Sequence, residues 1–101
     1  MLRMMKIGGQ DCPVVMCDVC HQRIVNGSDG AFYWATDESG EMVEQGRILF
    51  LHGACSKAFE DANYHLDWCH LPLECLPICL GDNLNLDWQA ARARADKETG
   101  A

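Results

Sequence analysis

Two short stretches decide the fold: CDVC at residues 17–20 and HGAC at residues 52–55. In each stretch, two residues separate the two side chains that can bind a metal ion. A tight turn of this spacing can aim both of its ligands at one point. Three thiolates and one imidazole are together the ligand set of a closed, four-coordinate structural zinc site. The sequence therefore predicts one zinc ion per chain. Its predicted ligands are Cys17, Cys20, His52 and Cys55.

The segment between the two ligand pairs has the pattern of a β-hairpin. Residues 31–36 (AFYWAT) are rich in aromatic side chains and follow a dense turn signal, which is typical of a strand. Because side chains alternate along a strand, Phe32 and Trp34 are expected on one face and Tyr33 on the other. A second strand is expected to end in residues 48–51, immediately before the second ligand pair.

A helix is expected to begin at the second ligand pair. Cys55, Ala58, Phe59 and Ala62 are spaced at i, i+3, i+4 and i+7, which places them on one face of a helix. Cys55 would lie in the first turn, where the positive end of the helix dipole favours its thiolate. The expected order is therefore a cysteine turn (the knuckle), a hairpin, and a helix whose start supplies two ligands.

This arrangement resembles the treble-clef zinc fingers, and in particular the first finger of a LIM domain, C-x2-C…H-x2-C. Phe50 and Leu51 before the histidine and Phe59 after the last cysteine add to the likeness. The resemblance covers residues 14–63 and implies a treble-clef fold that binds zinc through the four residues named above. The chain departs from the LIM pattern in two ways. The segment between the ligand pairs is longer, and no second C-x2-C follows to form a second finger.

The length of 101 residues predicts one small α+β domain stabilised by zinc, because a short chain buries a limited core. Residues 1–13 contain two glycines and a proline and are expected to be a flexible lead-in. Residues 14–63 are the expected treble-clef domain. Residues 64–101 are expected to be a helical extension packed on that domain.

Two short helices are expected in the C-terminal extension. Leu73, Leu76 and Leu80 suggest the first, which Pro77 would kink or divide. Asn85 is the expected N-cap of the last helix, which runs to about residue 96. Four side chains, at the start of this last helix and within it, are expected to face inward: those of Leu84, Trp88, Ala91 and Ala95.

Composition and charge exclude several classes of protein. Hydrophobic residues make up 49% of the chain and charged residues 23%, which is typical of a folded protein. The formal net charge of −7 disfavours non-specific attraction to nucleic acids and to anionic membranes. The apolar runs are too short for a membrane span or a signal peptide, so a cytoplasmic location is expected. Seven cysteines without a secretory signal favour metal binding over disulfides.

The first cysteine pair also fits two other kinds of site. Residues 17–21 spell C-x-x-C-H, the attachment motif of c-type haem, with His21 as an axial ligand. Haem attachment normally follows export, and it would leave His52 and Cys55 without a role. A thioredoxin-like redox pair needs a βαβ setting, which the sequence does not predict. Zinc explains both ligand pairs and is therefore preferred.

A second metal site is the alternative for the C-terminal cysteines. Cys75 and Cys79 are four residues apart and could share a helix face. Cys69 and His70 are adjacent, which makes it awkward for both to bind one ion. The other interpretation is that Cys75 and Cys79 pack in the core as small apolar residues. Their core neighbours would be Leu73, Leu76 and Leu80.

These features predict a non-catalytic module, because four protein ligands leave zinc no open position for water. A protein partner that meets the acidic hairpin or the C-terminal helices is the preferred hypothesis. One alternative is a nucleic-acid-binding finger, which Arg92, Arg94 and Lys97 would support. Another is a thiol or metal sensor that uses the spare cysteines. The sequence names neither the partner nor an oligomeric state. The hairpin acids are interpreted as a solvated face: Asp29, Asp37, Glu38, Glu41 and Glu44.

Overall fold

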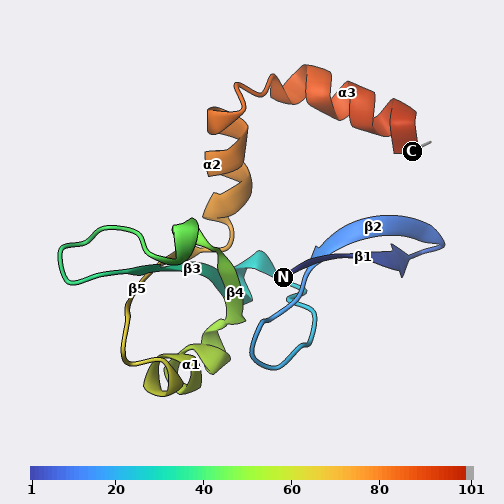
Figure 1. Cartoon of the computed structure of the whole chain (residues 1–101). Coiled ribbons are helices and arrows are strands. Elements are labelled where there is room, and N and C mark those ends of the chain that lie inside the picture. The colour runs from blue at the N-terminus through green and yellow to red at the C-terminus, as the bar shows by residue number, and fades with distance from the viewer. Residues whose placement is uncertain (100–101) are drawn as a thin grey trace.

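A computed structural model describes residues 1–99 and shows two small antiparallel sheets and three helices (Figure 1). This confirms the expected small α+β class. Residues 100–101 of the predicted extension lie outside the described part. The strands are β1 (Leu2–Ile7), β2 (Gln10–Val15), β3 (Gly30–Thr36), β4 (Leu49–His52) and β5 (Asp67–Pro72). The helices are α1 (Ser56–Ala62), α2 (Cys75–Asn83) and α3 (Trp88–Thr99).

The larger sheet has the order β4-β3-β5, so the aromatic strand β3 lies in the middle. The predicted alternation of its side chains is confirmed. The rings of Phe32 and Trp34 share one face with centroids 5.9 Å apart, while Tyr33 faces α1 and meets Phe59 at 6.3 Å. Phe59 also packs edge-on against Trp68 of β5 at 4.8 Å. Helix α1 therefore covers one face of the sheet through its aromatic side chain.

The third strand, β5, is absent from the sequence-based prediction, which placed only helices after residue 63. It pairs antiparallel with β3 over its whole length, from Ala31↔Pro72 to Thr36↔Asp67. The segment DWCHLP has no clear alternation and ends in proline, so its local pattern is weak. It becomes a strand because β3 offers a free edge, and pairing satisfies the backbone groups of both strands.

Residues 1–13, expected to be a flexible lead-in, instead form most of a β-hairpin with residues up to Val15. Strands β1 and β2 pair in register from Leu2↔Val15 to Ile7↔Gln10. Gly8 and Gly9 connect them with φ values of +59° and +84°, a left-handed turn that suits two glycines. The same glycines that indicated a loop therefore make the tight turn of a hairpin. All six residues of β1 are exposed.

The first C-terminal helix is continuous, so the predicted kink at Pro77 is wrong. Helix α2 begins at Cys75, which places Pro77 in its first turn. Amide groups there have no partner within the helix, so a proline costs no hydrogen bond.

The last helix starts later than predicted, and its cap is Asp87 rather than Asn85. The Asp87 carboxylate accepts a hydrogen bond from the Ala90 amide at 3.0 Å. Asn85 adopts a left-handed conformation with φ +52° between the two helices. The predicted inward orientation is also wrong for Leu84, Trp88 and Ala95, which are exposed, whereas Ala91 is half-buried. Leu84 is 70% exposed and Trp88 is 51% exposed, because no other element covers that side of the chain's described part.

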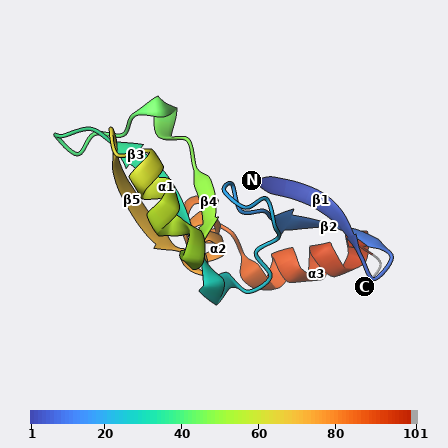
Figure 2. The same ribbon diagram turned by 90° about the horizontal axis from the view of Figure 1, so that it is seen from below.

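The molecule is elongated, measuring 46 × 29 × 21 Å. Its radius of gyration is 15.7 Å, whereas a compact chain of this length has about 13 Å. Figure 1 shows that α2 projects from the sheet and that α3 turns away from its end. In Figure 2, α3 extends toward the same side of the molecule as the β1–β2 hairpin. Within residues 1–99, no helix combines the length and the apolarity needed to cross a bilayer.

Candidate metal centre

The structure brings all four predicted ligand side chains together. The Sγ atoms of Cys17, Cys20 and Cys55 and a ring nitrogen of His52 all lie within 4.8 Å of one another. Around tetrahedral zinc, ligand atoms lie about 3.8 Å apart, given Zn–S bonds of about 2.3 Å. The Cys20 sulfur and His52 Nδ1 are already 3.3 Å apart. The cluster is therefore close to the geometry that a bound ion would require.

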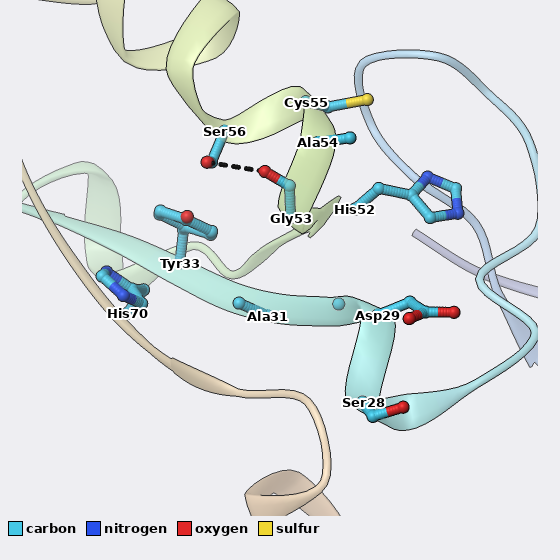
Figure 3. A pocket seen from close by; sticks show the side chains of 11 residues that line it. Ser28, Asp29, Ala31, Tyr33, His52, Gly53, Ala54, Cys55, Ser56 and His70 are labelled. Carbon is cyan, nitrogen blue, oxygen red and sulfur yellow. Dashed lines mark hydrogen bonds between the residues drawn. The ribbon is translucent and has the colours of Figure 1, made fainter.

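Each ligand pair is held by a short, well-defined piece of backbone. In the knuckle, the His21 amide donates to the Cys17 carbonyl at 3.0 Å and closes the turn, and the Cys17 side chain is fully buried. His52 is the last residue of β4. Cys55 ends a 3₁₀ turn and is the N-cap residue of α1, close to its predicted place in the first turn of the helix. Ser56 steadies this turn by donating to the Gly53 carbonyl at 2.9 Å (Figure 3).

Asp18 joins the two ligand pairs, a role that the sequence pattern does not indicate. Its amide donates to the Phe50 carbonyl at 2.7 Å, and its carboxylate accepts from the Phe50 amide at 2.8 Å. The same carboxylate oxygen lies 3.2 Å from the Met1 ammonium group. The knuckle is therefore tied to β4 two residues before His52. Only the pairing of distant segments reveals this role, because nothing in the motif C-x2-C requires an aspartate.

The thiols of the cluster differ in how readily they ionise. Burial raises the pKa of Cys17, but hydrogen bonds from the backbone amides of Cys20, His52 and Val19 outweigh it and lower the pKa to about 6. One of these donors is the His52 amide, at 3.4 Å from the Cys17 sulfur. The lowered pKa favours the thiolate form of Cys17 at neutral pH, and the thiolate is the form that binds a cation.

The pKa of Cys55 is shifted in the opposite direction, upward. Burial raises its pKa, and hydrogen bonding and charge repulsion from Cys17 and Cys20 raise it further, to about 11. Three thiolates in one cluster repel one another unless a cation neutralises them. Because metal ligands must be deprotonated, binding of an ion would displace the Cys55 proton.

A hollow of about 700 Å³ lies beside the cluster. The Tyr33 and His70 rings stack along one side of it, with centroids 5.0 Å apart. Figure 3 shows His52 and Cys55 pointing away from these two rings, so the polar side chains of the hollow do not converge. The nearby Ser56 hydroxyl donates to a backbone carbonyl.

The residues considered for a second metal site do not converge; they are Cys69, His70, Cys75 and Cys79. Cys69 and His70 are consecutive residues of β5, so their side chains point to opposite faces of the sheet. Cys75 is half-buried against the core, whereas Cys79 is exposed. Among residues 1–99, only one group of side chains is placed to hold a metal ion. The core interpretation therefore fits Cys75 and fails for Cys79.

Comparison with known proteins gave no matching family model, no matching curated protein and no matching solved structure. Neither a LIM nor a treble-clef identity is confirmed in this way. The geometry alone shows that a small α+β chain presents a cluster of three cysteines and one histidine that could hold a metal ion.

Proposed function

We propose that this chain is a zinc-binding module with a treble-clef finger and that it acts by binding another protein. The finger comprises the knuckle, β3, β4 and α1. The observation that carries the zinc proposal is the convergence of three thiols and one imidazole within 4.8 Å. Thiolate and imidazole ligands in a tetrahedral set favour zinc over hard cations, which prefer oxygen.

A structural rather than catalytic role follows from the number of ligands. Four protein ligands complete a tetrahedral site and leave no position for a reacting water molecule. The buried core is small: within the described residues, the largest fully buried side chains are those of Leu51 and Cys17. A metal that joins the knuckle to β4 and α1 therefore adds stability that this core needs.

A protein partner is supported over nucleic acid by charge. The net charge of −7 opposes approach to a phosphate backbone. One of the candidate cations, Arg92, lies 3.3 Å from Asp96 in an ion pair along α3. Large apolar side chains are meanwhile exposed on both the N-terminal hairpin and the C-terminal helices, which is typical of protein-binding surfaces.

Elemental analysis tests the metal. Protein purified without added metal should contain about one zinc per chain, because the structure offers one four-ligand set. The matched control is the variant Cys79→Ser, which changes an exposed cysteine outside the cluster and should keep its zinc. Absence of zinc, or a ratio near two, would contradict the proposed site.

The partner is tested by capture with the zinc-loaded chain as bait. The bound proteins should be the same before and after nuclease treatment, and the bait Cys55→Ser should lose them. We also expect no retardation of generic duplex DNA at physiological salt, because the net charge is −7. Retardation that weakens steeply with salt would instead support the nucleic-acid finger.

A further inference from the structure

The first six residues of helix α2 are all apolar, yet most of them are exposed. Residues 75–80 read CLPICL, and of these only Cys75 and Leu76 pack against the core. Ile78 is 57% exposed and Leu80 is 49% exposed. Residues two apart on a helix point in nearly opposite directions, so apolar surface is open on both sides. A helix with apolar residues all round is normally buried.

The chain after α2 extends this apolar surface around a corner. Leu84 and Leu86 are exposed in the connection, and Trp88 opens α3 with half of its surface exposed. The corner is rigidly built, because the Leu86 amide donates to the Gly81 carbonyl at 2.8 Å. The Trp88 ring also lies directly on Gly81, where an added Cβ would sit only 2.2 Å from the ring. A surface held in this way loses little freedom when it binds.

We call residues 75–91 the arm; they comprise α2, the connection and the first turn of α3. Its charges all have one sign. No lysine or arginine occurs between residues 58 and 91, and Glu74, Asp82 and Asp87, on or directly before the arm, are exposed. An anionic membrane or a nucleic acid would be repelled from this surface. A second copy of the chain is also disfavoured, because both copies carry a net charge of −7.

We infer that the arm is the docking surface for a basic amphipathic segment of another protein, with apolar residues for the arm and lysine or arginine beside them. The apolar residues would cover Ile78, Leu84 and Trp88, and the basic residues would meet the acidic rim. Amphipathic helices recognise apolar grooves and surfaces in this manner. The inference rests on the proposed function and names the chemistry of its partner.

The first test uses the zinc-loaded full chain and two synthetic peptides, followed by fluorescence anisotropy. Each peptide has about 18 residues, or five helical turns, with leucines at the same positions. The remaining positions are lysine in one peptide and glutamate in the other. We expect the lysine peptide alone to bind, and more weakly as salt rises. Equal binding of both peptides, or no binding of the lysine peptide, would overturn the inference.

The second test locates the apolar contact. Ile78→Ser and Leu84→Ser each remove an exposed apolar side chain from the arm and should weaken binding of the lysine peptide about ten-fold. Val25→Ser and Met42→Ser are matched controls, since these residues are 69% and 68% exposed but lie outside the arm. The controls should bind like the unchanged chain. Equal losses in both pairs would mean unspecific adhesion and would overturn the inference.

The third test separates local charge from overall charge. Asp82→Lys and Glu38→Lys each change the net charge from −7 to −5, but only the first changes the arm. We expect Asp82→Lys to weaken binding about ten-fold and Glu38→Lys to leave it within two-fold. Equal effects would show attraction to the whole molecule rather than to the arm, and the proposal would be wrong.

Two further measurements distinguish this inference from the proposed function. If the unchanged chain dimerises in sedimentation and Leu84→Ser abolishes the dimer, the arm binds a second copy and the inference is wrong. If Leu84→Ser keeps its zinc and captures the same nuclease-resistant proteins as the unchanged chain, the module binds protein through another surface. In that case the proposed function stands and the assignment to the arm fails.

Discussion

The core around the candidate metal site, residues 14–73, and the arm, residues 75–91, are both rich in apolar residues, yet they bury them to very different extents. Leu51 in β4 is fully buried, whereas Leu84 in the arm is 70% exposed. The core leucine lies in a sheet that has a helix on one face. The leucine of the arm lies in a connection that no other part of the described chain covers. Apolar composition alone therefore does not decide burial; the availability of a packing partner does.

The two regions also differ in how far apart their contacts lie in the sequence. The core is joined by pairings such as Trp34↔Cys69 and by the hydrogen bonds of Asp18 with Phe50. The backbone hydrogen bonds at the arm's corner, such as those from Leu84 to Leu80 and from Asn85 to Asp82, join residues only three to five positions apart. Local contacts of that kind open more easily than buried long-range ones.

Replacing Cys55 with serine should remove the metal and unfold the core. The binding energy of structural zinc is about 10–16 kcal/mol in zinc-finger peptides, and a small domain has a net stability of only about 5–15 kcal/mol. Removing one ligand therefore removes more stabilising free energy than the net stability of the core. Thermal unfolding with and without a chelator, together with metal analysis, measures the effect. Cys55→Ser protein that keeps its zinc and its melting temperature would show that the ligand is wrongly assigned.

Truncating one leucine in each region compares their packing directly. Leu51→Ala should cost about 3 kcal/mol of unfolding free energy, because it opens a cavity at a fully buried position. Leu84→Ala removes the same atoms from an exposed position and should change stability by less than about 0.5 kcal/mol. Denaturant unfolding of the zinc-loaded proteins gives both values. Similar costs would mean that the arm is buried in solution.

Removing the Asp18 carboxylate should weaken metal binding without removing a ligand. Asp18→Ala leaves the Phe50 amide without its acceptor, and the expected loss of affinity is about ten-fold, as for other groups that position metal ligands. Asp18→Asn keeps an acceptor oxygen and should lose less. Competition with a chromophoric chelator measures the affinity. Asp61→Ala, which breaks an exposed ion pair with Lys57, is the matched control. Equal affinities for Asp18→Ala and this control would argue against a positioning role.

The smallest effects distinguish two cysteines of α2. Cys75→Ala should cost about 1 kcal/mol because its side chain packs against the core, whereas Cys79→Ala should be close to neutral. Both variants should keep their zinc. Alkylation followed by mass spectrometry should modify the exposed Cys79 before Cys75. Faster modification of Cys75 would show that the start of the arm opens away from the core.

Much of the core could be predicted because its signals are local. Side-chain alternation predicts the strand that contains Phe32 and Trp34, and helical spacing predicts the helix that contains Phe59. The spacing within the two ligand pairs predicts that they converge. The errors occur where a local signal had two meanings. Glycines taken for a loose lead-in make a hairpin turn, and Pro77 was expected to kink a helix that it only begins.

The sequence by itself determined the candidate ligand set and the order of knuckle, strand and helix, because cysteine and histidine spacing and side-chain periodicity depend on neighbouring residues. Only the tertiary structure decided that residues 67–72 form a strand, since that strand exists by pairing with β3. It also revealed Asp18 as the link between the ligand pairs and left Leu84 uncovered. These outcomes depend on contacts between distant segments, and a sequence pattern records each segment without its partner.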